Sequence, residues 1–330
     1  MTPRGISVNL IGRDNGSGLT RDTQLLAKIL EAAGFSVSYY AVGKPSLPHK
    51  VRRLTTAVEQ WTSQTLRQRP RYDINLFIED VVPRWFPFAR KNCLIPNQEW
   101  FRQEWKPYLS QFDAILCKTH LAEAVFSPLA PTEFISFSSF DRSRRDISPN
   151  YDRCFHLGTT SSRLGTTVLL DLWRSRPDFP QLTLVRQQPP PSDFKADNID
   201  YIEGIVSEET LVTYFNRHGI QVYPTQMEGF GHRLVEAMSC EALTVTTNAP
   251  PMNEIVRPER GVLAEYDSTE PHLWGTKYNV TKSTLERALE TVWGYDEAKR
   301  REFGKRGRSW YEENDRFFRR RLVEVLQHLI

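Results

Sequence analysis

The chain has 330 residues, a formal net charge of +3 at pH 7, 39% hydrophobic residues and 25% charged residues. These values are typical of a water-soluble globular protein of two domains, and so small a charge argues against a nucleic-acid partner. No apolar run approaches the ~20 residues of a membrane-spanning helix, and the N-terminus reads as a strand rather than a signal peptide. The four cysteines lie far apart without metal-ligand spacing, which predicts buried free thiols in the reducing cytoplasm.

The first half of the chain alternates short apolar runs with helical patterns, which predicts a parallel sheet covered by helices. It opens with an expected strand at 6–11, a glycine-rich turn at 12–18 and a helix that ends at Gly34. The further strands expected in this half are 35–40, 74–78, 93–95, 114–117 and 134–137. Polar residues then interrupt the pattern around 148–150, where we expect a hinge.

The second half repeats the alternation, beginning with an expected strand at 154–157 and a helix around 167–173. Further strands are expected at 182–185, 220–223 and 243–247, with a proline-rich loop at 187–192 and helices through the tail. The pattern predicts an α/β protein with an N-terminal Rossmann-like domain over 1–149, a C-terminal one over 150–310 and a final helix over 311–330.

The most informative segment joins the expected strands at 220–223 and 243–247. It carries Glu228 directly after the first strand, then Gly229, Phe230 and Gly231, and then a helical pattern that contains Glu236. Ligands of open α/β sheets bind at the carboxyl ends of the strands, and helix N-termini favour phosphate. Carboxylates accept hydrogen bonds from hydroxyl groups. A nucleotide sugar offers both groups, although a solvated helix face can also carry such a pair of glutamates.

The motif Glu228-Gly-Phe-Gly-x-x-Leu-Val-Glu-Ala-Met resembles the donor-site signature of retaining glycosyltransferases with the GT-B fold, most closely glycosyltransferase family four. Asn248, 254–256 and 261–263 are also similar to that family. The resemblance implies two Rossmann-like domains that face each other across a cleft, with the last helix, 317–329, crossing back to the first domain.

The same resemblance implies transfer of a sugar from a nucleotide-diphosphate sugar to a hydroxyl acceptor, which would be a glycan, a lipid-linked molecule or a small molecule. Glu236 would hold the ribose hydroxyls and Glu228 would act catalytically on the transferred sugar, beside the backbone N–H groups of 229–231. The leaving diphosphate would take the acceptor proton, so no protein nucleophile, metal or cofactor is expected. A non-catalytic GT-B-like protein that binds a sugar nucleotide or glycan is the alternative.

The glycine-rich turn at 12–18 has the order Gly-x-x-x-Gly-x-Gly, which is not the dinucleotide fingerprint Gly-x-Gly-x-x-Gly and disfavours a nicotinamide enzyme. The resemblance instead places Gly16 and Gly18 against the donor diphosphate; a plain tight turn is the other interpretation.

The chain departs from the family where an arginine and a lysine usually neutralise the diphosphate, since Thr159 and Leu164 stand there. Arg163 and Arg186 are the nearest candidates for the counter-charge. His232 and its neighbour Arg233 also replace an apolar residue and a proline inside the signature. Either the diphosphate is held differently or activity is lost.

The acceptor side offers weaker signals. Glu79, Asp80 and Glu99 are candidate acceptor-binding groups in the first domain, although solvated loop acids are the more ordinary interpretation. Residues 44–71 hold seven cations and one acid, with apolar residues at helical spacing. This segment predicts either a helix with a solvated basic face or peripheral contact with an anionic membrane or polyanionic acceptor.

Overall fold

The structure is a computed structural model that describes residues 5–13, 18–42, 70–158, 162–190 and 196–330. The chain divides into two compact units, Met1–Phe137 with Arg316–Ile330, and Ser138–Asp315. Residues 138–149, which the sequence pattern assigned to the first domain, therefore group with unit 2. Among the described residues, no helix has the length and apolar composition that crossing a bilayer requires.

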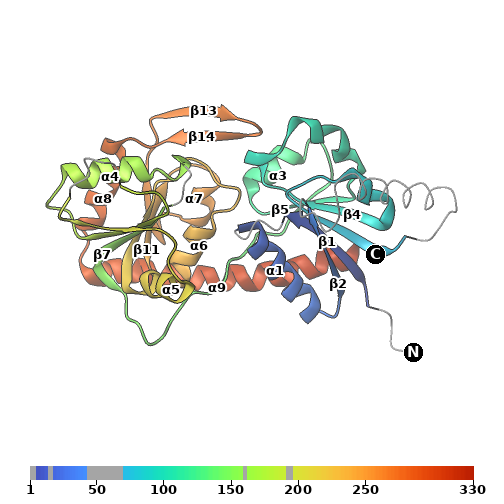
Figure 1. Ribbon diagram of the computed structural model, residues 1–330, viewed down its shortest axis with the longest axis horizontal. Helices are drawn as coiled ribbons and strands as arrows, with labels where there is room; N and C mark the ends of the chain where they lie inside the picture. The colour runs from blue at the N-terminus through green and yellow to red at the C-terminus, as the bar shows by residue number, and fades with distance from the viewer. Residues whose placement is uncertain (1–4, 14–17, 43–69, 159–161, 191–195) are drawn as a thin grey trace. The chain divides into compact units, whose positions relative to one another are not determined.

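Unit 1 is built on a six-stranded parallel sheet with the strand order β2-β1-β3-β4-β5-β6 (Figure 1). Its strands are β1 (Ser7–Arg13), β2 (Ser36–Val42), β3 (Tyr72–Ile78), β4 (Ala89–Ile95), β5 (Ala114–Cys117) and β6 (Thr132–Phe134). Helices α1 (Gly18–Ala32) and α3 (His120–Phe126) and the 3-10 turns η1 (Pro83–Phe88), η2 (Gln98–Trp100) and η3 (Gln103–Gln111) follow the strands. The central strands β1, β3 and β4 are buried over most of their length, because a parallel sheet is covered on both faces, and they include the buried Asn9, Asn75 and Asn92.

Unit 2 repeats the architecture with the strand order β12-β11-β10-β7-β8-β9, again all parallel. Its strands are β7 (Asn150–Leu157), β8 (Leu182–Arg186), β9 (Ile199–Glu203), β10 (His218–Tyr223), β11 (Leu243–Thr247) and β12 (Gly261–Ala264). Its helical elements are η4 (Ser162–Leu164), α4 (Thr166–Ser175), α5 (Glu208–Arg217), α6 (His232–Ser239), α7 (Met252–Ile255), α8 (Lys282–Trp293) and α9 (Glu297–His328), whose last residues belong to unit 1.

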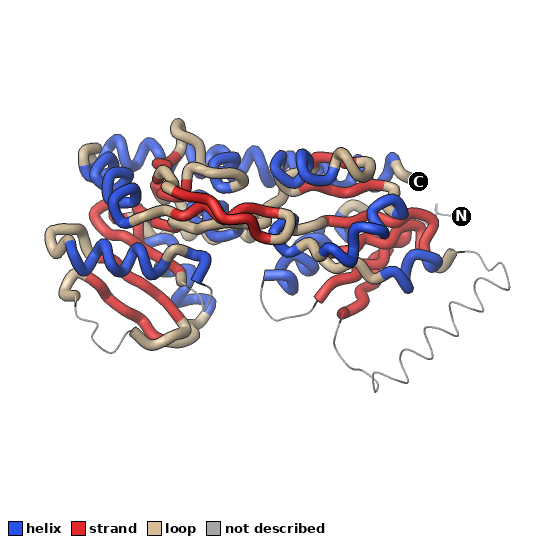
Figure 2. Tube along the Cα trace, turned by 90° about the horizontal axis from the view of Figure 1, so that it is seen from above, coloured by secondary structure: helices blue, strands red, loops and turns tan. Residues whose placement is uncertain are grey.

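An antiparallel hairpin, β13 (Ser268–His272) and β14 (Gly275–Asn279), lies outside the six-stranded sheet of unit 2 (Figures 1 and 2). This hairpin is not predicted by the sequence pattern. Its residues are polar or half-buried and show no apolar alternation, so periodicity gives no signal there.

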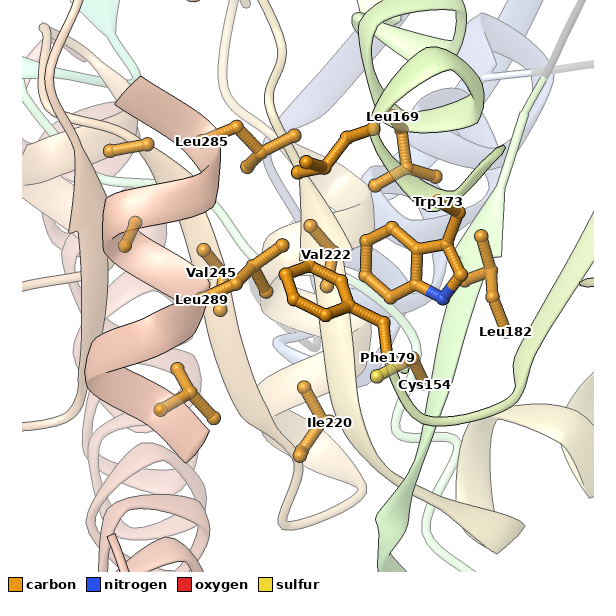
Figure 3. Close-up of a cluster of buried hydrophobic side chains, with 14 of the residues drawn as sticks. Cys154, Leu169, Trp173, Phe179, Leu182, Ile220, Val222, Val245, Leu285 and Leu289 are labelled. Atoms are coloured by element: carbon orange, nitrogen blue, oxygen red, sulfur yellow. The ribbon is translucent and has the colours of Figure 1, made fainter. Parts of the chain in front are cut away.

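The core of unit 2 forms between the sheet and the helices α4 and α8 (Figure 3). Trp173 is fully buried, meets the ring of Phe179 edge-on at 5.3 Å between centroids, and donates its indole N–H to the Pro180 carbonyl at 2.9 Å. Burial of such aromatic side chains contributes about 2–3 kcal/mol each. The four cysteines are free and buried, as predicted.

Helix α9 approaches the backbone of unit 2 so closely that only a glycine fits at one point. A Cβ atom on Gly304 would lie 1.9 Å from the Glu241 carbonyl oxygen and 2.6 Å from the Tyr151 hydroxyl. That hydroxyl donates to the same carbonyl at 2.7 Å. The helix is thus seated directly on the turn that follows α6.

Gly304→Ala is expected to destabilise the protein by about 1–3 kcal/mol or more, because the methyl group overlaps backbone that cannot move aside. Gly294→Ala is the matched control: its nearest neighbours would lie at an ordinary 3.5 Å and its φ is −68°, so it should change stability by less than about 1 kcal/mol. Urea denaturation followed by circular dichroism measures both. Equal stability of the two variants would contradict this contact.

Candidate functional site

The candidate site of unit 2 lies where the order of the strands reverses. From β7 the chain builds β8 and β9 to one side and then returns to place β10 on the other side. In open α/β sheets, the carboxyl ends of two such strands border the crevice in which ligands bind. Glu228 and the glycines of the signature stand in the loop after β10.

The two loops are held together by backbone contacts. Gly165 has φ +67°, and a Cβ atom there would lie 2.2 Å from the Pro224 carbonyl oxygen. The Gln226 N–H donates to the Arg163 carbonyl at 2.8 Å. A residue with a side chain at position 165 would push the two loops apart, so this glycine sets the distance between them.

Buried His156, on β7, connects this strand with β10 and with the start of α4. Its Nδ1 lies 2.7 Å from the Val222 carbonyl oxygen on β10, and its Nε2 lies 2.8 Å from the Thr166 hydroxyl at the start of α4. A carbonyl only accepts, so Nδ1 carries the hydrogen and Nε2 accepts from Thr166. Burial lowers the pKa of His156 to about 4, with smaller effects from Arg233 and Arg186.

The carboxylate of Glu228 is held by neighbouring side chains and remains partly exposed to solvent. The Thr225 hydroxyl lies 3.1 Å from its Oε1, and Nη1 of Arg233 lies 4.0 Å from the same oxygen. Its side chain is 20% exposed. The carboxylate can therefore accept a hydrogen bond from a ligand without being drawn into the core.

Gly231 turns the chain into helix α6. Its φ of +108° lies in the left-handed region, and a Cβ atom would come within 3.1 Å of Leu234 and 3.2 Å of Ile255. The predicted helix after the glycine turn is present and begins at His232. Phe230 is buried, and its ring meets that of His232 edge-on at 5.6 Å between centroids.

Glu236 lies deeper than Glu228 and has a charged partner that sequence reasoning missed. Its side chain is 5% exposed, and its Oε2 lies 3.0 Å from Nε of Arg142, whose side chain is 2% exposed. Burial lowers the pKa of Arg142, but Glu236 and Glu208 outweigh that effect and leave it raised. No motif marks Arg142, because it precedes β7 in a polar stretch far from the signature in sequence.

Arg163 and Arg186, the two candidate cations, lie in η4 and at the end of β8. The stem of Arg186, at the end of β8, lies beside Gly158, where a Cβ atom would come within 3.3 Å of its Cγ. Arg163 precedes α4, and its charge helps to lower the pKa of His272, whose shift comes mainly from burial. Leu164 is buried, and Thr159 lies outside the described residues.

Unit 1 reverses its strand order between β1 and β3, and polar side chains gather at the carboxyl ends of these strands. Arg13 makes a two-pronged ion pair with Asp80 at 2.6 and 2.7 Å. Asp80 and Glu99 are buried, so the interpretation of these acids as solvated loop residues is wrong. Gly18 opens α1, and Gly16 lies outside the described residues.

Glu79 follows β3 with a φ of +64°, a strained conformation for a residue with a side chain. Its Oε2 accepts from Asn97 Nδ2 at 2.8 Å, and Asn97 Oδ1 accepts from Lys118 Nζ at 3.1 Å. Lys118 also contacts Asp22 at 3.1 Å. Burial raises the pKa of Glu79, and the charge of Lys118 opposes it. The side chains form one continuous network at this edge of the sheet.

Residues 44–69 of the basic segment lie outside the described residues, and membrane contact stays a prediction. Within the described part of the chain, no cluster of His, Cys, Asp or Glu residues has an arrangement that could hold a metal ion.

We compared the chain with known protein families and with curated proteins. Residues 195–271, which contain Glu228 and Glu236, match the model of a family described as Glycosyl transferases group 1. None of the curated proteins matches the chain.

Several solved structures resemble the whole chain. The sucrose-phosphate synthase of Thermosynechococcus elongatus has a TM-score of 0.66 at 16% identity, over 98% of this chain and 99% of that one. A glycosyltransferase from Rickettsia africae has a TM-score of 0.68 at 11% identity, over 98% of both chains. A structure described as trehalose-6-phosphate from E. coli bound with UDP-2-fluoro glucose has a TM-score of 0.66 at 10% identity, over 98% of this chain and 99% of that one.

These likenesses confirm the predicted fold class, an α/β GT-B fold with two Rossmann-like domains.

The neutral state of His156 predicts an acid sensitivity of the fold. The folded-state pKa is about 4 and the unfolded one about 6.5, so the unfolded chain binds more protons between these values. The stability that neutral His156 provides is complete above pH ~6.5 and is lost as the pH falls towards 4, by up to about 3 kcal/mol.

Urea denaturation of the unmodified protein and of His156→Gln, at pH 7.5, 6, 5 and 4.5, checks this. His218 remains in both, and burial lowers its pKa as well, so the difference between the two curves isolates position 156. The unmodified protein should lose stability more steeply. If the stability of the two proteins fell in parallel with pH, the neutral state of His156 in the folded protein would be contradicted.

Proposed function

We propose that this protein is a retaining glycosyltransferase, which transfers a sugar from a nucleotide-diphosphate sugar to a hydroxyl acceptor. One observation carries the proposal: Glu228 and Glu236 stand at the strand-reversal crevice of unit 2, on the loop and helix that follow β10, inside the segment that matches the glycosyltransferase family model. The family-four resemblance of the motif supports the retaining mechanism.

The two glutamates would divide the donor between them. Glu236, buried in α6, suits the hydroxyls of the ribose, whereas Glu228, which is more exposed, suits the hydroxyls of the transferred sugar. The backbone N–H groups of Gly229, Phe230 and Gly231 would contact that sugar, and His232 would flank it at the N-terminus of α6.

The reaction would need no protein nucleophile. The bond from the sugar C1 to the diphosphate oxygen breaks, and the bond from C1 to the acceptor oxygen forms on the same face. The acceptor proton passes to the leaving diphosphate. The charge that develops on the diphosphate requires fixed cations, and Arg163, Arg186 and Arg233 are the candidates, with Gly16 and Gly18 of unit 1 approaching the phosphates. Neither a metal nor a cofactor is required by this scheme.

The acceptor would be a glycan, a lipid-linked molecule or a small molecule that binds at the carboxyl edge of unit 1. Glu79 is the candidate group there, because it is strained, tethered to Asn97 and has a raised pKa that burial causes. Peripheral contact of residues 44–71 with an anionic membrane, and a cytoplasmic location, are parts of the same proposal.

A second candidate function is binding of a sugar nucleotide or glycan without catalysis. The observation that favours it is Leu164, which is buried and apolar where the family that the motif resembles carries a lysine. The protein would then hold the donor through Glu236 but stabilise the leaving group too weakly for transfer.

Titration with UDP-, GDP- and ADP-sugars, followed by assays of donor hydrolysis and transfer, tests the proposal. We expect one donor class to bind and to turn over. Glu236→Gln should weaken nucleotide binding by about 10- to 100-fold, because the hydroxyls lose a charged acceptor. Glu228→Gln should lower turnover by about 100-fold with a smaller change in affinity.

Glu313→Gln, an exposed position on α9, is the matched control and should behave as the unmodified protein. Unchanged nucleotide affinity in Glu236→Gln would refute the placement of the ribose. Tight binding of a donor with neither hydrolysis nor transfer would favour the non-catalytic alternative.

A further inference from the structure

The segment 138–149, which precedes β7 and which we call the connecting segment, runs along helix α6 and contacts it repeatedly. The Ser139 hydroxyl lies 2.7 Å from Nδ1 of His232. The backbone N–H of Arg142 donates to the Ser239 hydroxyl at 3.2 Å, and its side chain reaches Glu236. Two of the residues assigned to the donor site thus have partners on this segment.

Arg142 is fixed at both its backbone and its side chain. Its carbonyl accepts from Asn216 Nδ2 at 2.7 Å, and its guanidinium carbon lies 5.1 Å from the centroid of the Phe215 ring. One side of the guanidinium contacts Glu236 at 3.0 Å and another contacts Glu208 at 2.5 Å. A buried arginine is costly unless it is paired, and its planar group holds its partners in defined directions.

The two glutamates depend on Arg142 to different degrees. The side chain of Glu208 is 63% exposed and water can solvate it, whereas that of Glu236 is 5% exposed. Arg142 is therefore the charged partner that offsets the cost of burying the Glu236 carboxylate. A carboxylate offers about four acceptor positions, so a contact to one oxygen leaves capacity for ligand hydroxyls.

We propose that Arg142 is a positioning residue of the donor site, whose ion pair holds the Glu236 carboxylate in the orientation in which it accepts hydrogen bonds from the two ribose hydroxyls. Arg142 does not touch the ligand in this arrangement. The inference rests on the proposed function, since it assumes that Glu236 binds ribose. The connecting segment thereby becomes part of the donor site, although it lies outside the motif.

The preference of the protein for nucleotides that carry both ribose hydroxyls tests this role of Arg142. The unmodified protein is titrated by calorimetry with UDP, GDP and ADP, and the tightest binder is compared with its 2′,3′-dideoxy counterpart. We expect about 10- to 100-fold weaker binding of the dideoxy nucleotide, the worth of hydrogen bonds to a charged acceptor. In Arg142→Gln the ratio of the two dissociation constants, dideoxy nucleotide to ribonucleotide, should fall below about 3. The donor KM should rise by a larger factor than kcat falls.

Arg142→Lys keeps the charge but not the planar group, so it should show an intermediate ratio, and it carries the test should Arg142→Gln not fold. Arg144→Gln is the control in the same segment: its side chain is 45% exposed and pairs with Asp146, and the ratio should stay unchanged. If both Arg142 variants still bound the dideoxy nucleotide about 10- to 100-fold more weakly than the ribonucleotide, the proposed role of Arg142 would be refuted and the proposed function would stand. Absence of binding or of discrimination in the unmodified protein would instead refute the ribose assignment of the proposed function, and the inference with it.

Discussion

The structure of unit 2 depends on the adjacency of β7 and β10 in the middle of a parallel sheet. Because the chain extends the sheet first to one side of β7 and then to the other, the carboxyl ends of these two strands mark the position at which ligands of open α/β sheets bind. His156 joins the strands below the crevice, and the contact of Gly165 with Pro224 sets the distance between the loops. The signature residues of the loop and of α6 are placed by these two constraints.

Charge distinguishes the carboxyl edges of the two units. In unit 2 the arginines near the crevice belong to three different elements, η4, β8 and α6, and suit a ligand that carries phosphate. In unit 1 the cations Arg13 and Lys118 are engaged with Asp80, Asp22 and Asn97, so this edge presents a neutralised polar network. Such a network suits hydroxyl groups better than a diphosphate.

Local patterns in the sequence predicted the parts of this architecture that local physics determines. The strand before Glu228, the glycine turn and the helix from His232 all follow from periodicity and glycine placement, and the structure contains them. The different depths of Glu228 and Glu236 were not predictable, because exposure depends on which elements cover the helix. The burial of Asp80 likewise depends on Arg13, which is 67 residues away along the chain. Arg142 had no signal at all, since a lone arginine in a polar stretch is ordinarily a surface residue.

The pairing of Glu236 with Arg142 changes how the motif itself should be understood. Burying a carboxylate without a charged partner is costly, and a carboxylate whose partner is removed has no fixed orientation towards ligand hydroxyls. The motif supplies the carboxylate and the turn that exposes Glu228, but it does not contain the cation that pairs with Glu236. That group comes from the connecting segment, held by Ser239 and Asn216. A chain could therefore keep both glutamates of the motif and still lose donor binding through a change at position 142, so the motif alone is insufficient to define the site.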